Sequence, residues 1–224
     1  MSWRCDTLSG CVILARTMGG QLEKAIAILR RGGVIVFPTD TVYGLGADPR
    51  NEKAVRRIYQ IKGRAAGMAL PLLASGVRQV SAVAVMTDLG RRLAKSFWPG
   101  ALTLVLPRAS GFPGYVSAGR DTVAVRVPRH RVPAALARGL GVPVIGTSAN
   151  LSGQPSARTV DEAVGQLAGL VDGIIDLGPC CGGIESTVVD ATGDRPVVLR
   201  CGAVSEEAID SVLKERGGRQ KTCA

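Results

Sequence analysis

Three small polar residues follow a short apolar run in the first quarter of the chain, and their types suit the binding of a polar ligand. The apolar run, residues 34–37, consists of residues that favour a buried β-strand. It ends at Pro38, which has no N–H to donate to a neighbouring strand. The polar residues come next: Thr39, Asp40 and Thr41. Because ligands of α/β proteins usually bind beyond the carboxyl ends of strands, this stretch predicts hydroxyl and carboxylate groups at a ligand site.

Two cationic residues lie at the end of the next predicted helix. Residues 52–61 carry apolar side chains at helical spacing, and Lys62, Gly63 and Arg64 follow them. Gly63 is typical of the residue that ends a helix, so both cations are expected at its carboxyl end, where they suit an anionic ligand. The residues alone leave two other interpretations open. The polar triplet also fits a capped turn, and both cations also fit solvated charges beside a helix dipole.

Two later segments combine predicted strands with anion-binding residue types. Residues 121–128 alternate as a strand that places Thr122 and Arg126 on one face, which suits an anion but equally fits a solvated sheet edge. Residues 142–146 predict another strand, which leads to Ser148 and Asn150. Serine and asparagine are also common helix caps, so this pair has a purely structural alternative.

The order of these features closely resembles the YrdC-like family of threonylcarbamoyl-AMP synthases. The signature of that family is P-T-[DE]-T-x-Y-G-L followed by K-x-R, here at residues 38–45 and 62–64. Further family motifs occur in the same order: W-P-G-x-x-T-L-V-L at 98–106, S-x-N at 148–150, x-S-T-V-[VI]-D at 185–190 and R-x-G at 200–202. Five motifs in register over residues 21–205 make a specific match. The chain departs from the family in the loop after the K-x-R motif, at Ala65, Met68, Ala69 and Leu73.

The resemblance implies an enzyme that condenses L-threonine, bicarbonate or CO2 and ATP to threonylcarbamoyl-AMP and pyrophosphate. It also implies that the product serves threonylcarbamoyladenosine formation in tRNA, with tRNA and downstream modification proteins as partners. Residue by residue, it assigns L-threonine to Thr41, Arg126 and Ser186. It assigns ATP to Lys62, Arg64, Thr122, Ser148, Asn150, Ser156 and Arg200, with Lys62 and Arg64 as the catalytic residues. Mg²⁺ is expected to arrive with ATP, because no carboxylate cluster is visible in the sequence.

The composition agrees with a phosphate-handling enzyme. The formal charge of +10 over 224 residues indicates an anionic partner, while aromatic residues make up only 4% and offer few stacking surfaces for single-stranded RNA. No apolar run reaches the ~18 residues that a membrane span needs, and no signal-peptide core is seen, so a cytoplasmic protein is expected. The six cysteines form no C-x-x-C pair and His130 is the only histidine. We therefore expect no metal site and reduced, mostly buried thiols.

The predicted fold is α/β, with a single YrdC-like domain over residues 11–213 and flexible termini at 1–10 and 214–224. It consists of a twisted, mixed parallel and antiparallel sheet with flanking helices and a basic concave face. Hydrophobic residues make up 46% of the chain, enough for one sizeable core, and no repeat or linker divides it. Helices are expected at residues 21–31, 52–61, 87–97, 159–167 and 205–215. Strands are expected at 11–15, 34–37, 69–74, 102–106, 121–128, 142–146, 173–176, 185–190 and 197–200.

Two other functions fit part of the pattern. An RNA-binding module would use the basic face without chemistry, and it predicts salt-sensitive tRNA binding that is indifferent to ATP and threonine. A carbamoyl-transfer domain like that of hydrogenase maturation proteins would share the motifs. Those proteins normally carry zinc-finger and acylphosphatase segments, and neither is visible in these 224 residues.

Overall fold

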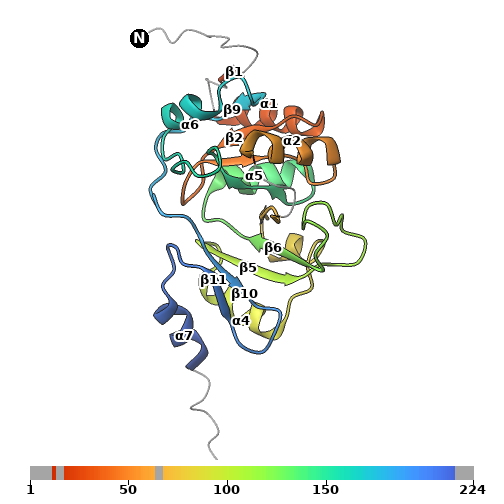
Figure 1. Cartoon of the computed structure of the whole chain (residues 1–224), viewed down its shortest axis with the longest axis vertical. Coiled ribbons are helices and arrows are strands. Elements are labelled where there is room, and N and C mark those ends of the chain that lie inside the picture. Colours follow the sequence, from red (N-terminus) through yellow and green to blue (C-terminus); the bar gives the residue numbers. More distant parts are fainter. Residues whose placement is uncertain (1–11, 14–17, 64–67, 215–224) are drawn as a thin grey trace, which may run out of the picture.

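The computed structural model describes residues 12–13, 18–63 and 68–214, and in it the strands divide between two mixed sheets (Figure 1). The five-stranded sheet has the order β1 (Val12–Ile13), β9 (Gly173–Ile174), β2 (Ile35–Phe37), β3 (Gly44–Gly46), β8 (Thr147–Ser148). The six-stranded sheet has the order β11 (Val197–Arg200), β10 (Thr187–Asp190), β5 (Leu102–Pro107), β6 (Thr122–Arg126), β4 (Leu72–Leu73), β7 (Val144–Ile145). Parallel and antiparallel neighbours occur in both sheets. The mixed α/β character predicted from the sequence is confirmed, but the strands form two sheets where the sequence analysis expected one.

The chain passes between the two sheets at Gly146, the single residue that separates β7 from β8. A Cβ atom at this position would lie 2.3 Å from Leu73 Cδ1, and one at Gly46 would lie 2.3 Å from the carbonyl oxygen of Ile145. Backbones and side chains therefore approach too closely here for any residue but glycine. The predicted strand at 142–146 is interrupted at this point because the chain leaves one sheet and joins the other.

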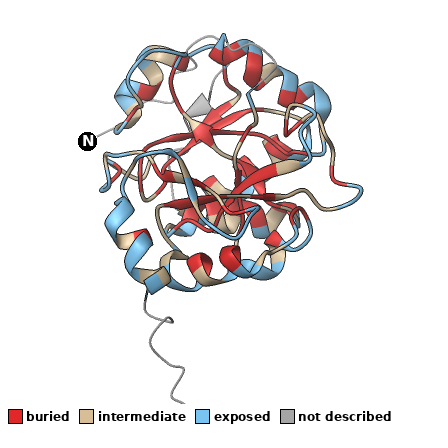
Figure 2. Cartoon of the chain, turned by 60° about the horizontal axis from the view of Figure 1, so that its bottom comes forward, coloured by how far each residue is buried: buried red, intermediate tan, exposed pale blue. Residues whose placement is uncertain are grey.

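The helices cover the outer faces of both sheets (Figure 1). Strand β2 alternates, so that Ile35 and Phe37 pack with helices α1 (Met18–Arg30) and α5 (Arg131–Leu140), while Val36 belongs to the core on the opposite side. That larger core includes buried residues of α2 (Glu52–Lys62), α4 (Asp88–Phe97), α6 (Val160–Leu167) and α7 (Glu206–Lys214). A short helix, α3 (Val77–Val80), joins β4 to the chain leading into α4. Figure 2 shows the resulting buried strands between more exposed helices.

Side-chain caps fix several helix starts that the sequence predicts. The Asn51 side chain accepts a hydrogen bond from the N–H of Ala54 at the start of α2, and Thr87 and Thr159 cap α4 and α6 in the same way. Gly63 ends α2 in the left-handed conformation, with φ of 59°. This confirms its predicted role and fixes Lys62 in the last turn of the helix.

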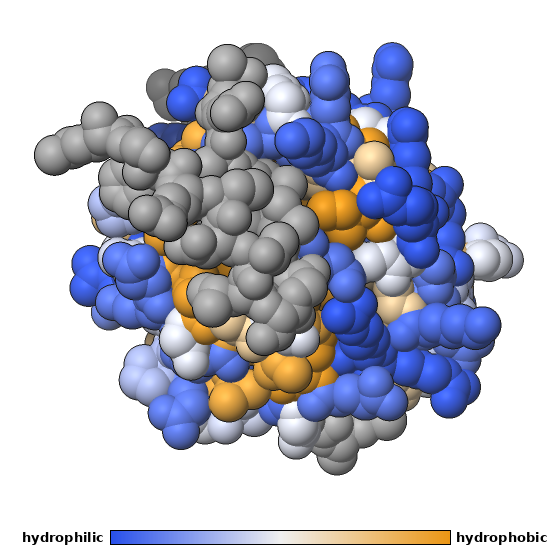
Figure 3. Space-filling view, turned by 90° about the horizontal axis from the view of Figure 1, so that it is seen from above, coloured by the Kyte–Doolittle hydropathy of each residue, from blue (hydrophilic) through white to orange (hydrophobic). Residues whose placement is uncertain are grey.

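The sequence analysis did not predict helices α3 and α5 or strands β3 and β8, and the remaining differences concern strand lengths and chain ends. The predicted strand at 69–74 is reduced to β4, and the predicted strands at 121–128 and 173–176 are also shorter. Lys214 is the last residue of α7, whereas residues 1–11 and 215–224 lie outside the described part of the chain. Within the described residues, none of the helices has the length and apolar character that a membrane crossing needs. The end of the molecule in Figure 3 presents mainly hydrophilic side chains around hydrophobic ones, and the basic concave face stays a prediction.

Candidate functional site

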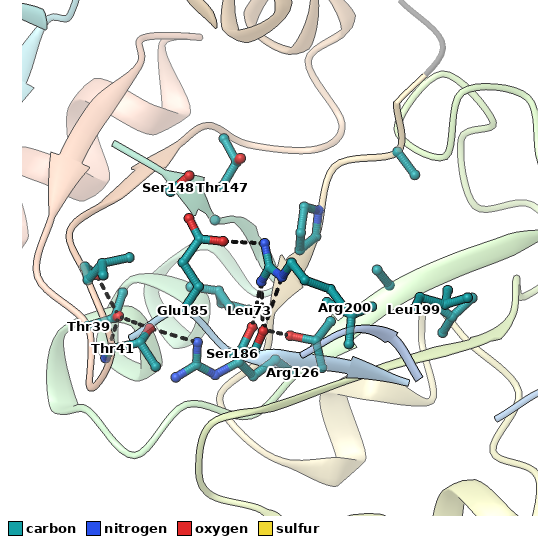
Figure 4. Close-up of a pocket in the computed structure, with 18 of the residues that line it drawn as sticks. Thr39, Thr41, Leu73, Arg126, Thr147, Ser148, Glu185, Ser186, Leu199 and Arg200 are labelled. Atoms are coloured by element: carbon teal, nitrogen blue, oxygen red, sulfur yellow. Dashed lines mark hydrogen bonds and ion pairs between the residues drawn. The ribbon is translucent and has the colours of Figure 1, made fainter. Parts of the chain in front are cut away.

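A cavity of about 300 Å³ opens between the two sheets, beside the turn that follows β2. Figure 4 shows polar side chains from both sheets directed into it. Five residues that the sequence predicts for the site line this cavity: Thr41, Arg126, Ser148, Ser186 and Arg200. They come from segments that are far apart in the sequence, and the meeting of the two sheets brings them together. Thr39, from the polar triplet that the sequence places at a ligand site, also lines the cavity, whereas sequence reasoning missed Thr103, Arg120, Thr147 and Glu185.

Arg126 is the most buried cation of the cavity wall. It ends β6 and is held from three directions: Nε donates to the carbonyl of Gly100 at 2.8 Å, Nη1 to Thr41 Oγ1 at 3.0 Å and Nη2 to Asp40 Oδ1 at 2.6 Å. Burial lowers the pKa of Arg126, and the neighbouring Asp40 carboxylate opposes that shift. A guanidinium has five N–H donors, so these three bonds leave two for a ligand. One of these remains on each Nη atom, and guanidinium donors suit a carboxylate.

The turn that carries Thr41 is tied by its own hydroxyl groups. Thr39 Oγ1 donates to the carbonyl of Val42 at 2.7 Å and accepts from the N–H of Thr41 at 3.1 Å. The loop containing Gly182 packs directly against this turn, because a Cβ atom there would lie 2.4 Å from the carbonyl oxygen of Asp40. Backbone contact on one side and hydroxyl bonds on the other therefore fix the position of Thr41.

Ser186 connects the buried side of the cavity with Arg200. Its hydroxyl lies 2.8 Å from Thr103 Oγ1 on β5, and its carbonyl accepts from Arg200 Nη2 at 2.8 Å. Arg200 ends β11, the strand next to β10, so the register of these two strands places the guanidinium above Ser186. Figure 4 shows Arg200 extended across the cavity toward Glu185.

Lys62 organises the segment that carries Ser148 and Asn150. Its side chain is buried at the end of α2, and Nζ lies 2.6 Å from the carbonyl of Ser148, 2.9 Å from that of Asn150 and 2.9 Å from Asn150 Oδ1. An ammonium group has three donors, so all three meet acceptors of this segment. The structure therefore gives Lys62 a positioning contact. A direct bond to a phosphate would require exchange of one of these donors.

Glu185 is the functional side chain that the sequence analysis missed. Its carboxylate accepts a hydrogen bond from Ser156 Oγ at 2.5 Å and pairs with Arg200. Burial raises the pKa of Glu185, but the hydrogen bond from Ser156 and the charge of Arg200, with smaller effects from Ser148 and Lys62, outweigh burial and lower it. Glu185 is the only acidic residue among the described lining residues. Four residues predicted for ATP, Ser156, Arg200, Ser148 and Lys62, thus surround one carboxylate.

The other predicted residues have different positions. Thr122 begins β6, at the opposite end of that strand from Arg126, and it does not line the cavity. Asn150 and Ser156 contact lining residues from behind. Arg64 and Ala65 lie outside the described residues. Of the loop departures noted in the sequence, Met68, Ala69 and Leu73 all line the cavity and form part of its apolar wall.

The sequence analysis expected mostly buried thiols, and two of the described cysteines differ from that expectation. Of the three cysteines that the structure describes, Cys180 is buried, and burial raises the pKa of its thiol, but Cys181 and Cys201 are exposed. Cys181 lies in a surface loop and Cys201 directly follows β11. Neither position belongs to the hydrophobic core. In the described parts of the chain, no three His, Cys, Asp or Glu side chains gather as metal ligands.

Comparisons with known proteins point to one family. The Sua5/yciO/yrdC family model, described as "Telomere recombination", matches residues 27–202. The chain is 42% identical over 195 residues to the threonylcarbamoyl-AMP synthase of Bacillus subtilis, a match that covers 86% of this chain and 56% of that protein. It is 41% identical over 196 residues to the threonylcarbamoyl-AMP synthase of Pyrococcus abyssi, covering 87% of this chain and 58% of the relative. The chain thus spans a little over half the length of these two relatives.

A solved structure shows the same arrangement. The crystal structure of P. abyssi Sua5 complexed with L-threonine superposes with a TM-score of 0.85 and 39% sequence identity. The match covers 91% of this chain and 60% of that one.

Proposed function

This chain belongs to the Sua5/YciO/YrdC family, and from that premise we propose that it synthesises threonylcarbamoyl-AMP from L-threonine, bicarbonate or CO2, and ATP. Pyrophosphate is the second product. The observation that carries the proposal is that two separate polar clusters adjoin one cavity. One consists of Arg126 and Thr41, and the other of Arg200, Glu185 and Ser156. The first group suits an amino acid and the second suits a nucleotide. An adenylate of a carbamoylated amino acid requires both.

The chemistry asks for positioning and charge stabilisation. The amine of threonine attacks the carbon of CO2 and loses a proton, which gives a carbamate. A carbamate oxygen then attacks the α-phosphorus of ATP, the bond to the β-phosphate bridging oxygen breaks, and pyrophosphate leaves. Neither step needs a side-chain nucleophile. Among the described residues that line the cavity, none is a cysteine or histidine, which is consistent with this mechanism.

In the amino-acid half, Arg126 offers two N–H donors to the carboxylate of threonine. Thr41, in the turn after β2, and Ser186, the residue before β10, offer hydroxyl groups. Because Arg126 is buried and already fixed by Asp40, little side-chain entropy is lost when the carboxylate binds. This arrangement selects an amino acid by its charged end and holds its amine at a defined place.

In the nucleotide half, we assign ATP to Arg200 and Ser148 at the cavity, with Ser156, Lys62 and Asn150 behind them and Arg64 and Thr122 as further contacts. The cations stabilise charge that shifts toward the leaving pyrophosphate. Mg²⁺ bound to the triphosphate neutralises part of its charge, and Glu185 is the one described acid in the cavity wall that such an ion would meet. The donor set therefore fits an ion carried by ATP rather than one held by the protein.

The wider role follows from the product. A threonylcarbamoyl group activated as an adenylate is ready for transfer to a nucleophile, and we propose that it goes to an adenosine of tRNA with the help of further modification proteins. The charge of +10 favours an encounter with tRNA. We propose a cytoplasmic location for this reaction.

The test is detection of the product by mass spectrometry. The purified chain is incubated with ATP, Mg²⁺, L-threonine and ¹³C-bicarbonate, and the expected adenylate carries one ¹³C atom and disappears when threonine is omitted. Arg56→Ala serves as the control variant. It removes a cation from the same helix as Lys62, but one that forms an exposed ion pair with Glu52. It should retain full product formation. A folded wild-type chain that binds tRNA but makes no labelled adenylate would favour the RNA-binding function instead.

A further inference from the structure

Thr39 is buried beside Thr41, and its hydrogen bonds decide how the Thr41 hydroxyl is oriented. The two Oγ1 atoms lie 3.0 Å apart, a distance at which either hydroxyl could donate. Thr39 has only one hydroxyl proton, and that proton is committed to the carbonyl of Val42 at 2.7 Å. In a hydrogen bond between the two hydroxyl groups, Thr41 is therefore the donor and Thr39 the acceptor.

The hydrogen-bonding capacity of Thr39 is then complete. Its oxygen has two lone pairs, and these accept the N–H of Thr41 at 3.1 Å and the hydroxyl proton of the same residue. Nothing of Thr39 is left for a ligand. Its side chain supports the neighbouring residue and does not bind substrate.

The remaining capacity of Thr41 is a single acceptor position. Its proton goes to Thr39, and one of its two lone pairs receives the N–H of Arg126 at 3.0 Å. One lone pair is left at the cavity. A ligand group that meets Thr41 must consequently be a donor.

We propose that Thr39 is a positioning residue that makes Thr41 an acceptor-only group, so that Thr41 binds the amine or hydroxyl of the amino acid and rejects its carboxylate. The carboxylate is directed to Arg126, whose free groups are all donors. Thr41 and Arg126 thus have opposite hydrogen-bonding polarity, and a bound amino acid has one orientation that satisfies both. The identity of the amino acid as threonine rests on the proposed function, whereas the orientation of the hydroxyl does not.

Neutron diffraction of the deuterated, ligand-free protein tests the orientation directly. The deuterium of Thr41 is expected on the line to Thr39 Oγ1, and that of Thr39 on the line to the carbonyl of Val42. A Thr41 deuterium directed into the cavity would overturn the proposal. This result does not depend on catalysis, so it separates the inference from the proposed function.

Steady-state kinetics test the consequence for substrate. Thr39→Val keeps the shape but removes the acceptor for the Thr41 proton, and the KM for threonine should rise about tenfold, the effect of losing one hydrogen bond. The KM for ATP should not change. Thr39→Ser, which restores the hydroxyl, should lie within about twofold of the wild type.

A double-mutant cycle distinguishes positioning from general damage to the turn. If Thr39 acts through Thr41, then Thr39→Val should have no further effect on the KM for threonine in a Thr41→Val background. Equal effects in both backgrounds would overturn the proposal. Thr87→Val is the matched control, because the Thr87 hydroxyl makes the same two kinds of bond as that of Thr39. It donates to the carbonyl of Ala191 at 2.7 Å and accepts a hydrogen bond from the N–H of Gly90 at 2.9 Å. The threonine KM of this variant should equal that of the wild type.

Discussion

Arg126 and Arg200 line the same cavity and each pairs with a carboxylate, yet the two pairs have different surroundings. The side chains of Arg126 and Asp40 are 5% and 16% exposed, whereas those of Arg200 and Glu185 are 46% and 31% exposed. Both oxygens of Asp40 are occupied, one by Arg126 and the other by the N–H of Arg129 at 3.0 Å. The Arg200 pair is open to solvent at the cavity.

The difference separates a site that is rigid before the substrate arrives from one that rearranges with it. A buried ion pair has no water to replace a lost partner, so Arg126 and Asp40 stay together when an amino acid binds. Water can solvate Arg200 and Glu185, so their pair breaks at little cost. We therefore expect Arg200 to exchange Glu185 for a phosphate of ATP, while Arg126 keeps Asp40 and adds the amino-acid carboxylate.

The largest effect is expected from Arg126→Ala. This change leaves the carboxylate of Asp40 buried without its partner, which typically costs about 3–5 kcal/mol. The free energy of unfolding in urea should fall by that amount, and threonine use should be lost. Replacing both residues, Arg126→Ala with Asp40→Ala, should recover part of the stability but none of the threonine use. If Arg126→Ala alone were as stable as the wild type, the Arg126–Asp40 pair would not differ from the Arg200–Glu185 pair in its dependence on burial.

Arg200→Ala should change function without a comparable change in stability. Its partner is half-exposed, so the free energy of unfolding should fall by less than about 1 kcal/mol. The KM for ATP should rise about tenfold, the size of one charge-assisted hydrogen bond. The KM for threonine serves as the internal control. A loss of stability equal to that of Arg126→Ala would contradict the contrast between the pairs.

How far the sequence predicts this site differs between its two halves. The family resemblance assigns Thr41, Arg126 and Ser186, because the motifs that carry it are continuous stretches of the sequence. It does not identify Glu185, since a single acid before a strand has many ordinary roles and its neighbours Ser156 and Arg200 are distant in the chain. The same limit applies to Thr39, whose part depends on the direction of one hydroxyl proton.

The fold shows a similar limit. Helix starts such as Asn51 and Thr87 carry local signals in their capping side chains, and they were predicted within one or two residues. The division into two sheets has no local signal, because it depends on which strands pair across the chain. Lys62 illustrates this, since its acceptors lie 86 and 88 residues away and only the folded chain reveals that its donors meet one segment.

A smaller effect concerns the pH dependence of the exposed pair. The pKa of Glu185 is lowered in the folded protein, so its contribution to stability is complete above the unfolded value, about 4.3, and is lost as pH falls through the folded value. The difference in unfolding free energy between the wild type and Glu185→Gln should be constant from pH 7 to about 4.3 and should shrink below that range. Because the Arg200–Glu185 pair is partly exposed, this difference in unfolding free energy should stay under about 1 kcal/mol. A difference that grew toward acid pH would have the wrong sign.

The most direct measurement is pyrophosphate release over a grid of threonine and ATP concentrations for the wild type, Asp40→Asn and Glu185→Gln. Each substitution keeps the side-chain shape and removes one negative charge, so the two variants are matched controls for each other. Asp40→Asn should raise the KM for threonine and leave that for ATP unchanged. Glu185→Gln should change the KM for ATP alone. If both variants shift both constants by the same factors, the cavity does not have separate amino-acid and nucleotide halves, and the account is wrong.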